Sequence, residues 1–86
     1  MWYVYILASQ KDGKYYVGST DDLKRRLREH HEGHCESTRH RRPLVLEAYI
    51  AVREEATARN LEAYLKSGSG IATLRKRILT SGARRA

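Results

Sequence analysis

Arg26 and His30 have the types and spacing needed to act on a phosphodiester. They are four residues apart in a predicted helix and are therefore neighbours on its surface, beside the apolar seam of Leu23 and Leu27. An arginine can neutralise charge on phosphate oxygens, and a histidine can orient or move a proton. Runs of charged residues on helices are usually solvent-exposed faces. The alternative interpretation is therefore that Arg26 and His30 are ordinary surface residues without a catalytic role.

Tyrosines are concentrated in the predicted N-terminal hairpin, which holds four of the six in the chain: Tyr3, Tyr5, Tyr15 and Tyr16. Alternation along a strand places Tyr3 and Tyr5 on one face, and it sends Tyr15 and Tyr16 to opposite faces. A hydroxyl from this hairpin beside the helical arginine would be an activating group, whereas a buried tyrosine is usually a packed ring with a satisfied hydroxyl. Gly18 predicts a close approach of backbone or ligand, or a bend in the strand.

Glu62 is the candidate metal ligand. It lies beside the apolar face of a predicted helix, four residues before Lys66, so an ordinary i,i+4 ion pair is one interpretation. Mg²⁺ commonly takes only one or two protein carboxylates and completes its shell with water and substrate phosphate, so a metal ligand is the other. The remaining histidines are His31, His34 and His40, and their spacing is not that of a zinc site. We interpret them, and the single Cys35, as having no role in the chemistry.

The elements that position these residues are predicted in the order ββαβαα. Strand-forming residues on both sides of Asp12-Gly13 predict a hairpin, and Thr20 is the expected N-cap of a helix that stops near Gly33. A polar loop then covers residues 33–43. The remaining predictions are a strand at 44–52, a helix at 54–67 ended by Gly68 or Gly70, and a last helix built on Ile71, Leu74 and Ile78.

Length and composition limit the possible architectures. With 86 residues, of which 41% are hydrophobic, the chain is expected to form one small domain, over residues 1–80, and a basic tail at 81–86. The longest apolar runs are far shorter than the roughly 18–20 residues of a membrane span, and the first residues lack the basic segment of a secretory signal. We therefore expect no membrane attachment and a cytoplasmic location.

The charge favours a nucleic-acid partner. Seventeen Lys and Arg against ten Asp and Glu give a formal net charge of +7, and a high isoelectric point favours binding to polyanions. Solvated helix faces are the simpler interpretation of the same charges. The candidate nucleic-acid-binding residues are Lys24, Arg25, Arg39, Arg41, Arg42, Lys66, Arg75 and Lys76.

In combination, these motifs resemble the GIY-YIG nuclease domain, and the resemblance covers nearly the whole chain. It is closest to the small single-domain bacterial members of that superfamily. A tyrosine replaces the glycine of the family's first tripeptide. The resemblance rests on Tyr3-Val4-Tyr5, on Tyr16-Val17-Gly18, on the run from Ser19 to His30, on Ser37-Thr38 and on Arg41-Arg42-Pro43.

The resemblance implies an α+β fold, in which helices flank a three-stranded antiparallel sheet, and it implies a set of site residues. Tyr5 and Tyr16 match the tyrosines of the two tripeptides. Arg26 falls at the catalytic arginine and His30 at the histidine four residues later. Glu62 falls at the glutamate that binds the metal.

The function implied is hydrolysis of DNA by a metal-dependent endonuclease, with one Mg²⁺ or Mn²⁺ held by Glu62 and a structure-selective role in repair or recombination. Ser19 stands where excinuclease-type members carry a lysine, and the asparagine that some members place near the end of the domain is missing. The alternative is therefore a non-catalytic DNA-binding or RNA-binding module on the same scaffold. A protein partner and a homodimer are both compatible with the sequence.

Overall fold

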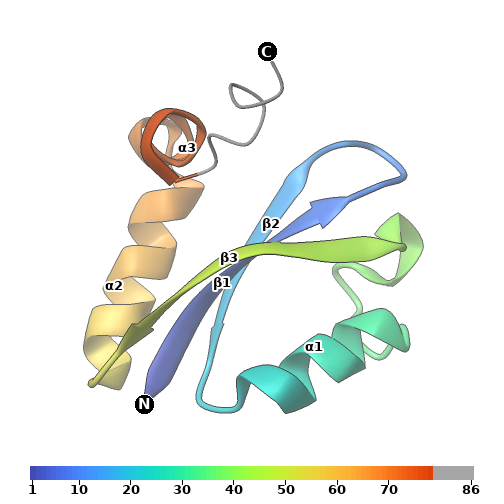
Figure 1. The fold of residues 1–86 in the computed structure, drawn as a ribbon, viewed down its shortest axis with the longest axis horizontal. Coiled ribbons are helices and arrows are strands. Elements are labelled where there is room, and N and C mark those ends of the chain that lie inside the picture. The colour runs from blue at the N-terminus through green and yellow to red at the C-terminus, as the bar shows by residue number, and fades with distance from the viewer. Residues whose placement is uncertain (79–86) are drawn as a thin grey trace.

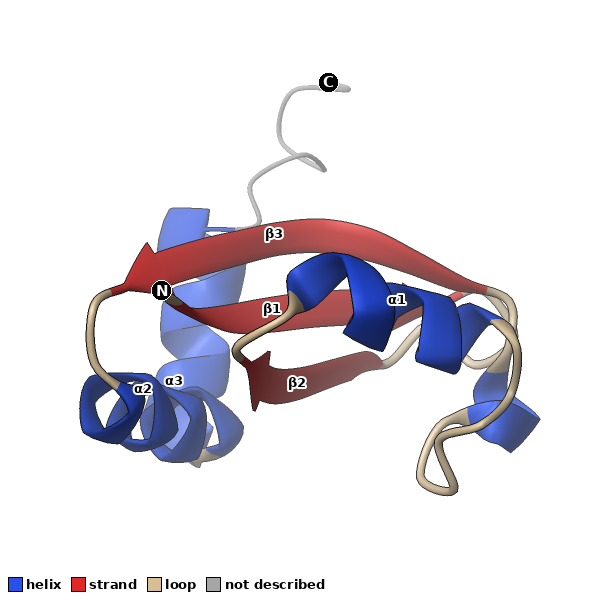
Figure 2. Ribbon diagram, turned by 90° about the horizontal axis from the view of Figure 1, so that it is seen from below, coloured by secondary structure: helices blue, strands red, loops and turns tan. Residues whose placement is uncertain are grey.

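The computed structural model describes residues 1–78 and shows a three-stranded antiparallel sheet with helices on both faces. Figure 1 shows α1 and α2 on opposite sides of this sheet, and Figure 2 shows the three strands with β1 in the middle. The predicted α+β class and the ββαβαα order are confirmed. The elements are β1 (Trp2–Ser9), β2 (Tyr15–Thr20), α1 (Leu23–His31), β3 (Leu44–Val52), α2 (Glu55–Lys66) and α3 (Gly68–Thr73), with a short 3₁₀ helix at Arg39–Arg41 and a π-helical turn at Leu74–Ile78.

The strand order is β2-β1-β3, so β2 and β3 are the two edges of the sheet. In the hairpin, Tyr5 pairs with Gly18 and Leu7 pairs with Tyr16, and across the other ladder Tyr5 pairs with Tyr49. Because paired residues share a face, Tyr5, Tyr16 and Gly18 all lie on the side covered by α1. The predicted hairpin is confirmed.

Each face of the sheet has its own apolar cluster. On the α2 side Val4, Ile6 and Val17 pack with Ala58 and Leu65 of α2. On the α1 side the cluster contains an aromatic ring as well as aliphatic side chains: Tyr5, Leu7 and Leu44, with Tyr16, Leu23, Leu27 and Leu46 against them. The α1-side cluster thus differs from the α2-side cluster in containing two tyrosines, Tyr5 and Tyr16.

Two predicted helix boundaries were wrong. Thr20 is the last residue of β2, paired with Tyr3, and Asp22 is the N-cap of α1, accepting a hydrogen bond of 3.1 Å from the amide of Arg25. Both side chains are good caps, and strand pairing decides between them. Thr20 instead accepts a bond from the amide of Asp22.

Gly68 and Gly70 do not end α2; they belong to α3. The hydroxyl of Ser67 caps this next helix through the amide of Gly70. A Cβ on Gly70 would collide with the backbone of Tyr64 and Leu65, so the glycine permits α3 to pack directly against the end of α2. The expected basic tail at 81–86 lies outside the described residues, as do the last two residues of the expected domain, 1–80.

None of the helices described between residues 1 and 78 has the length and apolar content that crossing a bilayer requires.

Candidate active site

A buried chain of hydrogen bonds joins β1, α1 and the loop after α1. The hydroxyl of Tyr5 lies 2.9 Å from Nε2 of His30, and Nδ1 of His30 lies 2.7 Å from Oγ1 of Thr38. Tyr5, His30 and Thr38 are all essentially inaccessible to solvent. The sequence placed His30 at the edge of the core, and this was wrong: the side chain is fully buried because both ring nitrogens find partners there.

The protons in this chain can be assigned from what each group can donate. Nε of Arg26 donates to the Tyr5 hydroxyl over 3.4 Å, and arginine has no acceptor. The Tyr5 oxygen therefore accepts from Arg26 and its own proton faces Nε2 of His30. Nδ1 then carries the ring proton and donates to Thr38.

The burial of this chain keeps it neutral. Burial lowers the pKa of His30 to about 4, and the nearby Arg26 guanidinium acts in the same direction. Burial also raises the pKa of Tyr5 to about 12, although the hydrogen bond from Arg26 opposes this. At neutral pH the imidazole is uncharged and the phenol keeps its proton.

Arg26 is fixed at two points and partly open to solvent. Besides its bond to Tyr5, its Nη1 makes a 3.0 Å ion pair with Glu29, which lies three residues along α1. The hydrogen bond to Tyr5 is the main cause that raises the pKa of Arg26 above its already high value. Within residues 1–78, its Nη2 makes no hydrogen bond, so the guanidinium keeps donors free while Nε and Nη1 hold it in place.

Gly18 permits the aromatic packing around this chain. A Cβ at Gly18 would overlap the ring and hydroxyl of Tyr5, which lies across β2 at this point. The sequence predicted a close approach at Gly18, and a side chain makes it. Tyr16 packs edge-on against His30, with ring centres 5.3 Å apart, and is tilted against Tyr5 at 6.3 Å. Unlike Tyr5, it is partly exposed.

Glu62 extends from α2 toward β2. Its Oε1 accepts a hydrogen bond of 2.5 Å from the Ser19 hydroxyl, and its Oε2 pairs with Nζ of Lys66 at 2.8 Å. Burial of the carboxyl would raise the pKa of Glu62, but the bonds from Lys66 and Ser19 outweigh this and hold it below its usual value. The expected i,i+4 pair with Lys66 is thus present, and the carboxylate is ionised.

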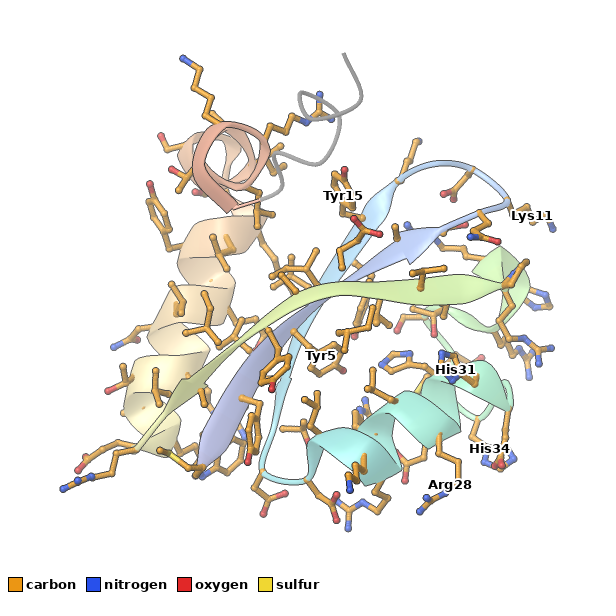
Figure 3. The ribbon with its side chains drawn as sticks, in the orientation of Figure 1. Tyr5, Lys11, Tyr15, Arg28, His31 and His34 are labelled. Atoms are coloured by element: carbon orange, nitrogen blue, oxygen red, sulfur yellow. The ribbon has the colours of Figure 1, made fainter. Side chains whose placement is uncertain are left out.

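The aromatic residues of the α1 face and the Glu62–Lys66 pair of the α2 face come into contact at the β2 edge. Since Gly18 shares the face of Tyr5, its neighbour Ser19 points to the α2 side, where it holds Glu62. Nζ of Lys66 lies 5.9 Å from the ring centre of Tyr16 and so connects the two groups. Figure 3 shows Tyr5 between the sheet and α1.

This arrangement has known counterparts. A family model for the GIY-YIG catalytic domain matches residues 1–75. The chain belongs to the GIY-YIG family. This GIY-YIG domain is also similar to the solution NMR structure of the UPF0213 protein BH0048 from Bacillus halodurans, with 32% identity, a TM-score of 0.60, and coverage of 100% of this chain and 95% of that one. No curated protein shows significant similarity to this chain.

The family establishes the general kind of function and no finer detail. A GIY-YIG domain is the catalytic domain of a nuclease family, whose members act on nucleic acids and generally use divalent metal ions.

Within residues 1–78, no cluster of three or more acidic, histidine or cysteine side chains could bind a metal by itself. The candidate donor set of this GIY-YIG domain is the ionised carboxylate of Glu62, with the Ser19 hydroxyl beside it. A hydrated Mg²⁺ or Mn²⁺ fits this set, because such ions accept one protein carboxylate and take their other ligands from water and phosphate. Lys66 holds the second oxygen of Glu62 and would have to release it for the metal.

The predicted nucleic-acid-binding residues fall into three groups. Arg25, Arg41 and Lys66 are held by carboxylates: Arg25 pairs with Asp21 and Glu29, Arg41 with Asp12, and Lys66 with Glu62. Arg39 and Arg42 donate to groups in the loop and to the end of α1 instead. The third group, Lys24, Arg75 and Lys76, makes neither an ion pair nor a side-chain hydrogen bond with another described residue, and all three are exposed.

Sequence reasoning missed two residues of the site. Thr38 was placed in a polar loop, yet it is fully buried and holds Nδ1 of His30. Ser19 was treated only as a departure from the excinuclease-type pattern, yet it holds Glu62. Alternation along β2 could have assigned Ser19 to the α2 face, whereas Thr38 was noted only as part of the Ser37-Thr38 motif, which gave it no role.

Proposed function

We propose that this protein is a divalent-metal-dependent endonuclease that hydrolyses DNA. One observation carries the proposal: Arg26 of α1, fixed at two points, is connected by a series of contacts to the partly exposed Tyr16 and the ionised Glu62. The contacts run from Arg26 to Tyr5, Tyr16, Lys66 and then Glu62. An arginine and a metal ion can stabilise the charge that develops on a phosphodiester during hydrolysis, and a tyrosine can move a proton.

Arg26 is suited to stabilise charge. Tyr5 and Glu29 use its Nε and Nη1, so the guanidinium is held in place before substrate arrives. Its free donors would contact the non-bridging oxygens of the scissile phosphate, where negative charge increases in the transition state. Donors fixed in advance need no reorganisation during the reaction, which is the source of their large effect.

Tyr16 is better placed than Tyr5 to take a proton from water. Tyr5 is buried and keeps its own proton, so we assign it to positioning Arg26 together with His30. Tyr16 is partly exposed, so its hydroxyl can reach a water beside a bound substrate, and Nζ of Lys66 lies 5.9 Å from its ring centre. The attacking water would form the new P–O bond and give a proton to the Tyr16 oxygen, while the phenol passes its own proton to solvent. The P–O bond to the 3′ oxygen breaks and that oxygen takes up a proton from solvent, leaving a 5′ phosphate and a 3′ hydroxyl.

Glu62 would hold one Mg²⁺ or Mn²⁺. When bound, this ion supplies positive charge to the scissile phosphate and to the leaving oxygen. Ser19 keeps the carboxylate oriented toward β2 through Oε1, and release of Oε2 by Lys66 would open the second oxygen.

The test is cleavage of labelled branched and linear DNA by the purified chain in Mg²⁺, in Mn²⁺ and in EDTA. Glu62→Gln should abolish metal-dependent cleavage and retain most of the DNA affinity. Glu55→Gln is the matched control, since Glu55 makes the same i,i+4 pair with Arg59 on α2, and it should cleave like wild type. Cleavage by Glu62→Gln at the wild-type rate would refute the proposal.

A nucleic-acid-binding module without turnover is the second candidate. It is favoured by the engagement of both Glu62 oxygens, one by Ser19 and one by Lys66. The same experiment separates the two, since a binder retards DNA or single-stranded RNA on a gel with or without metal and yields no fragments.

A further inference from the structure

A groove of about 420 Å³ opens beside the candidate site, on the α2 side of the β2 edge. Its apolar base is formed by three core side chains: Val17 of β2, Leu65 of α2 and Leu74 just after α3. Its volume falls in the range of small-ligand sites, roughly 300–1,000 Å³. The groove is thus large enough for a compact organic group and has an apolar surface to receive it.

The walls add an aromatic ring and positive charge. Tyr15 is 36% exposed and Ile71 41%, although both are large apolar side chains. Figure 3 places Tyr15 between β2 and α3. Of the residues that the structure describes, three cations also line the groove, Lys14, Lys66 and Arg75, and no acidic side chain does.

This combination matches an unpaired nucleotide. A nucleobase is flat and stacks on exposed aromatic rings, while its phosphate requires cations nearby. A base inside a duplex is stacked between its neighbours and cannot enter such a groove unless it leaves the stack. The groove therefore distinguishes single strands from paired ones by shape.

We propose that this groove holds one unpaired nucleotide of a forked or frayed DNA strand, with its base stacked on Tyr15. The proposal rests on the proposed nuclease function, because Tyr16 and Lys66 line the groove and also belong to the candidate site. The substrate class is then DNA in which an unpaired nucleotide adjoins the cleaved phosphodiester.

The experiment measures binding in EDTA, where no cleavage occurs. The probes are a forked duplex with 2-aminopurine in its unpaired arm and a fully paired duplex of equal length. Wild type should bind the fork at least about tenfold more tightly and change the 2-aminopurine fluorescence on binding. Tyr15→Ala should weaken fork binding by about 5–100-fold, the range that base stacking provides, and leave duplex binding unchanged.

Two further variants control for the ring and for folding. Tyr15→Phe keeps the ring and should retain the preference for the fork. Tyr49→Ala removes a tyrosine that is 53% exposed on the opposite edge strand, and it should change neither affinity. Ile71→Glu puts a carboxylate on the exposed wall, and it should remove the preference even if Tyr15→Ala fails to fold.

Equal affinity of wild type for fork and duplex would overturn the proposal. An unchanged preference in both Tyr15→Ala and Ile71→Glu would do the same. Cleavage in Mg²⁺ keeps this result separate from the nuclease proposal: a chain that cuts duplexes without preferring forks retains the nuclease and loses the groove. A chain that prefers forks and never cuts retains the groove and loses the nuclease.

Discussion

The two faces of the sheet hold their polar residues in opposite ways. On the α1 face Tyr5, His30 and Thr38 form a buried chain in which each ring nitrogen and the phenol have a partner. On the α2 face Glu62 and Lys66 form an ion pair whose side chains are 20% and 50% exposed. The first arrangement is rigid because breaking it leaves polar atoms dry and unpaired, whereas water can replace either partner of the second.

This difference assigns different tasks to the two faces. A buried, fully bonded chain can hold Arg26 in one position and has no capacity to exchange partners. An exposed ion pair stabilises the fold little and can be opened by a competing cation. We infer that the α1 face supplies fixed geometry and the α2 face supplies the exchangeable metal position.

The largest effect is expected from Arg26→Ala, which removes the group that the α1 face holds in place. DNA cleavage should fall by about 10²–10³-fold, the usual cost of losing one preorganised donor. Arg26→Lys should not restore it, because a lysine cannot bond Tyr5 and Glu29 while presenting further donors. Single-turnover cleavage assays measure the rate.

Arg25→Ala is the matched control for Arg26. It removes the neighbouring arginine, which is exposed and pairs with Asp21 and Glu29. Its cleavage rate should stay within about threefold of wild type, since exposed ion pairs contribute little. Equal losses in the two variants would show that total charge, and not the fixed position of Arg26, determines the rate.

Acid should destabilise the α1 face through His30. In the unfolded chain its pKa is near 6.5, and in the fold it is about 4, so between these values only the unfolded state binds the proton. The free energy of unfolding therefore falls as pH drops from 6.5 to 4, by up to about 3 kcal/mol. Urea unfolding across this range measures it. His30→Gln should lose this part of the pH dependence, whereas the exposed His31→Gln should keep it.

Thr38→Val tests whether the buried chain is as rigid as its contacts imply. Valine has nearly the shape of threonine but no acceptor, so Nδ1 of His30 would carry a buried, unpaired proton. The free energy of unfolding should fall by about 1–3 kcal/mol, measured in urea at pH 7. Ser37→Ala, at the exposed neighbouring position, should change it by less than about 0.5 kcal/mol. Equal stability of Thr38→Val and wild type would mean that water reaches Nδ1 of His30, and the buried chain would not be rigid.

The sequence was sufficient to predict those features that depend on the repeat of side-chain directions along one strand or helix. Alternation and Asp12-Gly13 identified the hairpin and placed Tyr15 and Tyr16 on opposite faces, and the spacing of Arg26 and His30 made them neighbours on α1 beside its apolar seam. The family motifs indicated Glu62 as a metal ligand, which stays a prediction. These features are local, because the pattern that produces each one lies within a single strand or helix.

Contacts between distant segments could not be predicted in this way. Thr38 is buried because its loop returns to α1, and His30 is buried because Tyr5, 25 residues earlier in the chain, bonds its ring. The end of α2 depends on how closely α3 packs against it at Gly70. In each case the deciding partner lies outside the segment whose pattern was interpreted.

The smallest effect is expected from Lys66→Met, which tests whether the α2 face is exchangeable. Losing this half-exposed pair should change the free energy of unfolding by less than about 1 kcal/mol. Mn²⁺ binding without DNA should tighten about two- to fivefold by calorimetry, because Oε2 of Glu62 becomes free and one competing charge is gone. Lys11→Met removes an equal charge at the hairpin tip (Figure 3) and should leave Mn²⁺ affinity unchanged. Weaker binding in Lys66→Met would mean that the lysine orients the carboxylate for the metal, and the contrast between the two faces would fail.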